Sequence, residues 1–318
     1  MTVYRTLLPA LCAALLAACG GGGGGTSSTS STATQQAAAS IVVSNEPGAP
    51  ARVGVTATDG LNWFNFRRQQ MGLPALTRNS VIDLAAQGHS DYQRINNTIV
   101  HDQTAGKNGY TGVTLLERLR QAGYTFAPRA DYAYGEVISA TTDPSGAYMA
   151  EELITAIYHR FVIFEPMFKE AGAGSATVAG GYTYFTTNFA ASNGYGPGIA
   201  RSTVAVYPYE NQINVPRNFF SDYELPDPVP GANEVGYPVS VHANINATVT
   251  VQSFTLAPRG GSPVSVRLLT SATDSETPVS AAAIVPLSVL TAGTVYTATF
   301  AGTVNGVQAN RTWNFTVR

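Results

Sequence analysis

The chain has 318 residues, of which 12% are charged, and its formal net charge is −2. This length is enough for two domains that each bury a core of their own. The near-neutral charge, without any basic run, argues against a nucleic-acid partner and against an electrostatically bound membrane surface.

The amino-terminal segment predicts export and a lipid anchor. Arg5 precedes an apolar run over residues 7–18, which has the length of a signal-peptide core and is too short to span a bilayer comfortably. The run ends in Leu-Ala-Ala-Cys-Gly (16–20), which resembles the lipobox at which a lipoprotein signal peptidase cleaves before an acylated cysteine. We therefore expect a lipoprotein signal peptide over residues 1–18 and a lipidated Cys19 that tethers the protein to the membrane.

The segment 19–44 starts at Cys19 and continues up to about residue 40 with Gly, Ser, Thr, Ala and Gln, and it contains no charged residue. Such a composition cannot bury enough apolar surface to offset the entropy of ordering, and it predicts a flexible linker. Because Cys12 and Cys19 are the two cysteines of the chain, no disulfide can cross-link the segments that follow.

Helical patterns and capping residues predict four helices in the next part of the chain. The first ends before Gly72, which suits a helix terminus, and the second and third open on the capping boxes Ser-Val-Ile-Asp (80–83) and Thr-Leu-Leu-Glu (114–117). The predicted helices cover about residues 58–71, a segment beginning at 80, residues 114–123 and residues 145–161.

Strands follow these helices. Residues 176–179 and 182–189 are separated by Gly180-Gly181, a pattern that favours a hairpin, and residues 203–207 predict a further strand. Helices around a small antiparallel sheet indicate an α+β layered domain, which we place at residues 45–207. Residues 208–238 contain six prolines, which interrupt both the helical and the strand pattern of apolar residues. This segment is therefore predicted to be a semi-rigid linker.

From residue 239 to residue 318 the pattern is wholly β. In residues 312–317 apolar and polar side chains alternate strictly, so one face of that strand should be buried. Asn305-Gly306 favours a tight type I′ turn. Short alternating strands over about 80 residues predict an all-β, immunoglobulin-like sandwich, and residues 290–300 resemble bacterial immunoglobulin-like domains of envelope proteins.

Three of the four histidines lie between residues 84 and 174. Histidine titrates near neutral pH, so histidines close to a carboxylate indicate a candidate functional site. The candidate site residues are His101, Glu136 and His159. We expect His89 to pack or hydrogen-bond on its helix and His242, in the β region, to be exposed.

Around these histidines the sequence resembles the CAP superfamily of cysteine-rich secretory, antigen-five and pathogenesis-related proteins, in its bacterial secreted form. The resemblance covers residues 55–207 and rests on five motifs: Leu-Asn-x-x-Asn-x-x-Arg (61–68), Ala-Ala-Gln-x-His-Ser (85–90), Gly-Glu (135–136), His-Arg (159–160) and Ala-Gly-Ala-Gly (171–174). It implies an α+β fold class, in which a CAP-type α-β-α sandwich precedes the immunoglobulin-like sandwich.

The family's cleft has two histidines and two glutamates, and the resemblance implies that His101, Glu136 and His159 occupy three of these four places. The second glutamate would fall near Ala156. Glu151 and Glu152 are close to that position but out of helical register, because each residue turns the helix by about 100°.

Two imidazoles and a carboxylate in one cleft have three possible uses: binding a divalent metal such as zinc, acid–base catalysis, or a hydrogen-bonded polar cluster. His101, Glu136 and His159 would suffice as metal ligands with a water in the fourth position. Neither His-Glu-x-x-His nor Gly-x-Ser-x-Gly occurs in the sequence. The sequence therefore leans away from an enzyme without excluding one.

The leading hypothesis is a lipid-anchored protein of the bacterial cell envelope that binds a lipid, glycan or protein ligand through His101, Glu136 and His159. One alternative is a metal-dependent envelope hydrolase or peptidase that uses the same residues as its catalytic groups. Another is a structural or adhesive surface protein.

Overall fold

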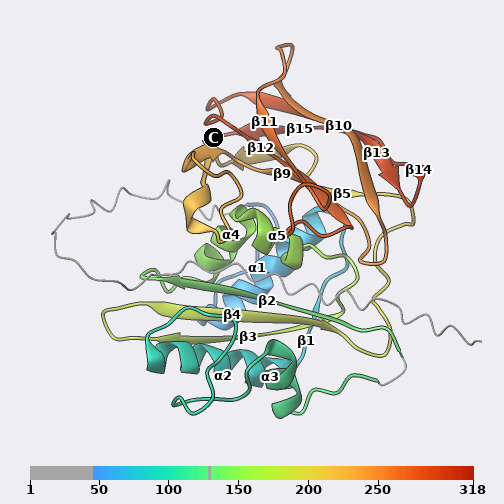
Figure 1. Ribbon diagram of the computed structural model, residues 1–318. Coiled ribbons are helices and arrows are strands. Elements are labelled where there is room, and N and C mark those ends of the chain that lie inside the picture. Colours follow the sequence, from blue (N-terminus) through green and yellow to red (C-terminus); the bar gives the residue numbers. More distant parts are fainter. Residues whose placement is uncertain (1–45, 128–129) are drawn as a thin grey trace, which may run out of the picture.

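The computed structural model describes residues 46–127 and 130–318 (Figure 1). The predicted signal peptide, Cys19 and the predicted linker over 19–44 lie outside the described residues. Within the described ranges, no helix combines the length and the apolar character needed to cross a membrane.

The first half of the molecule is a three-layer α-β-α sandwich, as predicted. Its central sheet has the order β1-β3-β4-β2, in which β1 is parallel to β3 and the other pairs are antiparallel. The strands are β1 (Thr77–Arg78), β2 (Ala133–Thr141), β3 (Glu170–Thr177) and β4 (Thr183–Ala191). Strands β3 and β4 form the hairpin expected across Gly180-Gly181.

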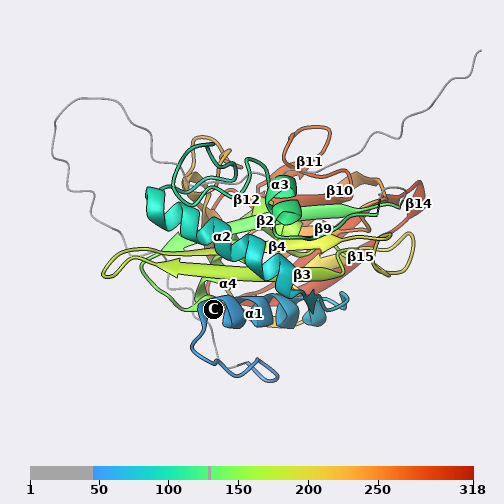
Figure 2. The ribbon, with the colours of Figure 1, turned by 90° about the horizontal axis from the view of Figure 1, so that it is seen from below.

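Five helices cover the two faces of this sheet. They are α1 (Thr56–Gln70), α2 (Ser80–Asn96), α3 (Leu115–Gln121), α4 (Gly146–Thr155) and α5 (Ile157–Ile163). Helices α2 and α3 lie on one face, and α1, α4 and α5 lie on the other (Figures 1 and 2). Buried side chains between the layers, such as Phe64 and Phe185, form the core.

Helix α2 lies directly on the backbone of β3 because two glycines leave room for it. A Cβ atom at Gly172 would come within 2.2 Å of the Asp83 backbone nitrogen, and one at Gly174 within 2.2 Å of the Gln87 backbone nitrogen. Gln87 also accepts a hydrogen bond from the Ser175 N–H at 3.1 Å. This close contact fixes α2, and with it His89, relative to the sheet.

The single helix predicted over residues 145–161 is in fact two helices. Ala156 has an extended backbone (ψ 120°) that separates α4 from α5. The first N–H groups of α5 are capped by the carboxylate of Glu224, which accepts from Tyr158 N at 2.7 Å and from His159 N at 3.1 Å. The interruption therefore depends on a residue that is distant in sequence.

The second half is a β-sandwich, as predicted. One sheet has the order β11-β12-β9-β5 and the other β10-β13-β15-β6, with β14 paired to β13. The strands are β5 (Ala205–Tyr207), β6 (Gln212–Val215), β9 (Val239–His242), β10 (Val249–Pro258), β11 (Val266–Thr270), β12 (Ala281–Pro286), β13 (Val295–Val304), β14 (Val307–Gln308) and β15 (Arg311–Val317).

Two sequence signals of the β region are confirmed at the level of single residues. In β15 the alternating residues Trp313, Phe315 and Val317 are buried. Asn305 and Gly306 have φ angles of 53° and 78°, and they connect the paired residues Val304 and Val307 of a tight hairpin. Positive φ at both central positions is what a type I′ turn requires.

The segment expected to be a linker contains regular structure. Besides β6, residues 208–238 contain the small antiparallel pair β7 (Asn218–Phe220) and β8 (Glu234–Gly236), with a 3₁₀ turn over Ser221–Tyr223 between them. Strand β5, which we expected in the first domain, pairs with β9 of the sandwich. Its register is Ala205 opposite His242, so the sandwich includes residues well before 239.

Buried groups join the two halves. Arg160 of α5 donates to the Pro238 carbonyl at 2.7 Å, and its guanidinium lies 5.0 Å and 4.9 Å from the ring centroids of Tyr207 and Tyr237. His242, which we expected to be exposed, is 2% exposed and meets the rings of Phe161 and Phe164. Burial, together with nearby arginine charges, lowers the pKa of His242 to about 3, so this histidine is neutral at pH 7.

Candidate functional site

Glu136 lies on β2, and the alternation of that strand decides which layer it meets. Gly135 faces α5, because a Cβ atom there would come within 2.7 Å of Val162. Ser139, on the same face as Gly135, donates a hydrogen bond to Glu152 of α4. Successive side chains of a strand point to opposite faces. Glu136 therefore points into the layer formed by α2, α3 and their connecting loop.

In that layer Glu136 forms a buried ion pair with Arg118 of α3. One guanidinium nitrogen of Arg118 lies 2.8 Å and 2.7 Å from the two carboxylate oxygens. His101 Nδ1 is 2.9 Å from the Oε1 atom. Burial alone would raise the pKa of Glu136, but the charge of Arg118 and the hydrogen bond from His101 hold it well below its ordinary value. Glu136 is thus a carboxylate at any physiological pH.

His89 completes this cluster as a neutral imidazole. Its Nε2 atom is 2.8 Å from the Val100 carbonyl, and its Nδ1 atom is 2.9 Å from the side-chain nitrogen of Gln103. Only a neutral ring can donate through Nε2 and accept through Nδ1. Burial, opposed in part by the charge of Glu136, lowers the pKa of His89 to about 4. The expectation that His89 serves packing and hydrogen bonding is confirmed.

The same cluster holds the loop between α2 and α3. Arg118 donates to the carbonyl oxygens of His101 at 2.7 Å and of Val113 at 3.0 Å. The side-chain oxygen of Gln103 accepts from Thr111 N at 2.7 Å. One buried arginine therefore binds Glu136 and both ends of the loop. His101 is the partly exposed member of this group, with 10% of its side chain accessible.

His159 lies on the other side of the sheet, on α5. Its Nδ1 atom is 3.0 Å from Oε1 of Glu224, a fully buried residue that follows β7. His101 and Glu136 are brought together as predicted, but His159 is separated from them by the sheet. The expected convergence of His101, Glu136 and His159 in a single cleft is therefore wrong. The reason is the strand alternation at Glu136, which directs this side chain away from α5.

Glu151 and Glu152 lie near the place expected for the second glutamate of the family cleft, and they have different surroundings. Glu151 accepts hydrogen bonds from Trp63 and from Arg67, which also pairs with Glu46 at 2.7 Å. Glu152 accepts from Ser139 at 2.7 Å. Burial raises the pKa of Glu152, while the Ser139 hydrogen bond and the charge of His159 act in the opposite direction. Glu152 is thus the glutamate of this helix that interacts with His159.

The donor set does not fit the zinc site that we considered. Both oxygens of Glu136 already accept hydrogen bonds from Arg118, whose positive charge would also repel a cation. His159 lies beyond the sheet from this carboxylate. Across the ranges that the structure describes, no three His, Cys, Asp or Glu side chains form a group that could hold a metal ion.

Two residues of these clusters were missed by the sequence analysis. Arg118 lies on a predicted helix where an arginine ordinarily faces solvent, and Glu224 lies in the proline-rich segment. Neither belongs to a motif. The one available signal for Arg118 was its place next to the apolar Leu119 in a short helix, because burial of that helix would require a partner for the charge.

Comparisons with known proteins find matches to the first half of the chain. The family model named CAP, described as the cysteine-rich secretory protein family, matches residues 61–189. The solved structures that match include an extracellular protein of Bacillus anthracis that contains an SCP domain, and an outer surface protein of Borrelia burgdorferi. No curated protein matches this chain.

Both structural matches are partial. The Bacillus anthracis protein is 24% identical, with a TM-score of 0.36, over 42% of this chain and 39% of that chain. The Borrelia burgdorferi protein is 13% identical, with a TM-score of 0.35, over 42% of this chain and 89% of that chain. The match therefore spans about two fifths of the length of the Bacillus anthracis protein.

Proposed function

Residues 61–189 form a domain of the CAP family of cysteine-rich secretory proteins, and from this premise we propose that the protein is a ligand-binding module of the bacterial cell envelope. The lipobox-like sequence that ends at Cys19 supports anchoring through an acylated amino terminus. The ligand classes that this proposal includes are a lipid, a glycan or a protein.

The observation that carries binding, in preference to hydrolysis, is the state of Glu136. A general base works best when its pKa lies near the working pH, and it must reach the group that it deprotonates. Glu136 is 5% exposed, both of its oxygens accept from Arg118, and its pKa is well below the ordinary value. The cluster of His89, His101, Arg118 and Glu136 therefore serves to hold the loop between α2 and α3.

A group of aromatic rings next to this cluster supplies the contact surface in our proposal. Phe126 lies 5.0 Å from Tyr132 and 5.9 Å from Tyr134, measured between ring centroids, and all three rings are partly exposed. Tyr134 is on the same face of β2 as Glu136. Partly exposed aromatic rings offer apolar contact area and a polar edge, which suits ligand binding. We include the exposed edge of His101 in this surface.

Retention of a soluble form that begins at residue 46 tests this proposal. The probes are isolated peptidoglycan, vesicles of phosphatidylglycerol and phosphatidylethanolamine, and immobilised envelope proteins. We expect saturable retention on one of them without any product by mass spectrometry. Tyr132→Ala should weaken retention about tenfold. Its matched control is Tyr182→Ala, which changes an exposed tyrosine on the β3–β4 turn. Equal effects of the two substitutions would contradict the assignment.

Hydrolysis remains the second candidate because of one observation, the pairing of His159 with Glu224. A carboxylate at Nδ1 orients an imidazole in the way that a general base requires. This candidate predicts that the protein hydrolyses a peptide or ester library and that His159→Gln abolishes the activity. Glu136→Gln should leave it intact. Absence of product with the folded parent protein would leave binding as the function.

The anchor is tested separately on the full chain expressed in a bacterial host. Labelled fatty acid should be incorporated into the protein, and Cys19→Ser should abolish the label and release the protein from the membrane fraction. Labelling that persists in the Cys19→Ser variant would contradict lipidation at this residue.

A further inference from the structure

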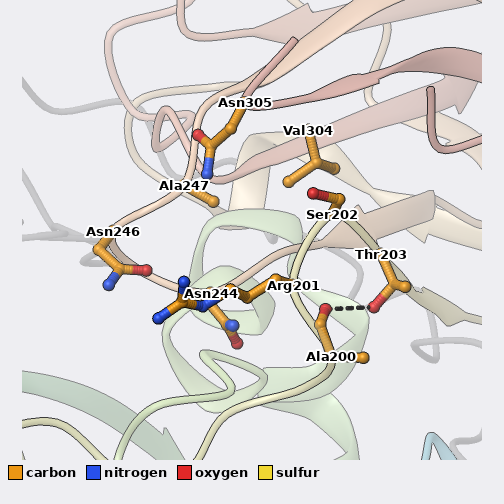
Figure 3. Close-up of a pocket in the computed structure, with 9 residues that line it drawn as sticks. All are labelled: Ala200, Arg201, Ser202, Thr203, Asn244, Asn246, Ala247, Val304 and Asn305. Carbon is orange, nitrogen blue, oxygen red and sulfur yellow. Dashed lines mark hydrogen bonds between the residues drawn. The ribbon is translucent and has the colours of Figure 1, made fainter. Parts of the chain in front are cut away.

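A polar cavity of about 300 Å³ lies at the junction of the two halves (Figure 3). Three segments that are distant in sequence form its walls. They are residues 200–203, which precede β5, residues 244–247 between β9 and β10, and residues 304–305 at the β13–β14 turn. Its volume is at the lower end of the range for small-molecule sites, which corresponds to one small ligand.

The walls are fixed by hydrogen bonds that use only part of each side chain. The Asn244 amide accepts from Ile199 N at 2.8 Å and donates to the Ile199 carbonyl at 2.9 Å. The Asn305 side-chain oxygen accepts from Thr248 N at 2.8 Å. Each amide NH₂ group has two donors, so Asn244 keeps one N–H and Asn305 keeps both for a ligand.

The turn that carries Asn244 is also anchored to the first half of the molecule. The Ile245 N–H donates to the buried carboxyl group of Glu165 at 3.0 Å. A Cβ atom at Gly198 would lie 2.3 Å from the Asn244 side-chain oxygen, so this position has to be glycine for the turn to approach. The cavity is therefore preorganised by contacts from both halves.

Arg201 and Asn246 add further hydrogen-bond donors to the cavity. Among the residues drawn in Figure 3, the one hydrogen bond is from the Thr203 hydroxyl to the Ala200 carbonyl. Arg201 and Asn246 are exposed and remain available within the cavity. The lining residues include a single charged group, the Arg201 guanidinium, and no carboxylate. The cavity thus offers amides, hydroxyls and one positive charge.

From this arrangement we propose that the cavity binds a sugar that carries a carboxylate, such as a uronic acid residue of a glycan. Arg201 pairs with the carboxylate, for which its planar fork of N–H donors is suited. The amides of Asn244, Asn246 and Asn305 bind the ring hydroxyls. The site is separate from the His101 and Glu136 cluster, and it goes beyond the binding function proposed for the CAP domain.

The lining disfavours two other ligand classes. A lipid chain requires an extended apolar wall, whereas only Ala200, Ala247 and Val304 contribute apolar side chains. An inorganic anion would pair with Arg201 but would fill only part of a cavity of about 300 Å³. A carboxylated sugar satisfies both kinds of donor.

Ligand-observed NMR titration of the purified protein tests this site, with glucuronic acid, glucose and inorganic phosphate as probes. We expect saturable binding of glucuronic acid that is about tenfold stronger than binding of glucose or phosphate. Arg201→Gln should remove the preference for glucuronic acid over glucose. Asn246→Ala should weaken binding of both sugars. The matched control is Arg259→Gln, which changes an exposed arginine of the sandwich outside the cavity.

Each other result overturns the proposal. Equal affinity for glucuronic acid and glucose, or an unchanged preference in Arg201→Gln, would exclude recognition of the carboxylate. Phosphate that binds as strongly as glucuronic acid would make the cavity a simple anion site. Loss of the preference in Arg259→Gln, or no binding of glucuronic acid by the folded parent, would remove the site altogether.

Discussion

At the scale of single residues, Arg118 and Glu136 form a buried ion pair in the first half of the molecule. Arg118 is 1% exposed and Glu136 5% exposed. Taking two charges out of water is costly, and their attraction offsets this cost only while both partners remain. Because Arg118 also donates to two loop carbonyls, the pair couples the sheet to the loop between α2 and α3.

We expect Arg118→Met to lower the free energy of unfolding by about 3–5 kcal/mol, since it leaves Glu136 charged and without its main partner. Urea denaturation monitored by circular dichroism measures this value. Arg120→Met is the control, because Arg120 is exposed on the same helix. Similar losses for Arg118→Met and Arg120→Met would show that the buried pair does not hold the domain together.

The depressed pKa of Glu136 adds an acid dependence. The folded-state pKa lies below the ordinary value of 4.5, so the stabilisation is present above pH 4.5 and is lost as the pH falls below it. Unfolding free energies measured between pH 6 and pH 3 should decrease less steeply in Glu136→Gln than in the parent protein. Parallel pH profiles would contradict the assigned ionisation.

At the scale of elements, the position of α2 depends on the absence of side chains in β3. Gly172 and Gly174 leave space that the backbone of α2 occupies. Any side chain there has to move the helix away, and α2 carries His89 of the buried cluster. Two glycines thus determine both the packing distance and the geometry of the candidate site.

Gly174→Ala should destabilise the protein by about 2–4 kcal/mol, because the new methyl group meets backbone atoms that cannot move aside. Thermal unfolding compared with Ser175→Ala, the neighbouring position of the same strand, isolates this effect. A Gly174→Ala variant as stable as Ser175→Ala would mean that α2 can shift at little cost.

The elements also show what a sequence can and cannot predict. The α2–α3 helices, the β3–β4 hairpin and the Asn305-Gly306 turn depend on neighbouring residues, and local patterns predicted each of them. The break at Ala156 depends on the Glu224 carboxylate, which caps α5 from a distant segment. The contact between Glu136 and Arg118 likewise could not be predicted from the residues next to either of them. The family resemblance correctly predicted that His101 lies near Glu136. It did not show that Glu136 points to the face of the sheet opposite His159.

At the scale of the whole molecule, Glu165 joins the two halves. Its Oε1 atom accepts from Met167 N and from Ile245 N, each at 3.0 Å. Burial raises the pKa of Glu165 to about 8, even though these hydrogen bonds and the charge of Arg68 act against the rise. The folded protein therefore holds this carboxyl group in its neutral form at pH 7.

This raised pKa predicts that the protein loses stability as the pH rises from 4.5 to about 8. The contribution of Glu165 is fully present below its unfolded pKa of 4.5 and is lost as the pH rises through about 8. Between these values the unfolding free energy should fall by about 1 kcal/mol per pH unit. Glu165→Gln, which keeps an acceptor oxygen without the titration, should flatten the profile. Identical profiles between pH 5.5 and pH 8 would contradict this role.

Strand β5 pairs with β9, and β6 pairs with β15. These pairings limit where recombination can separate the two halves of the protein. A recombination breakpoint at residue 239 would transfer a sandwich that lacks an outer strand in each of its sheets, and exposed strand edges promote aggregation. A viable exchange has to cut upstream of Ala205, in the chain that leaves β4. Even there, the transferred piece would lose the Arg160 side chain that now lies between Tyr207 and Tyr237. We therefore expect recombination to transfer the layered first half and this sandwich together.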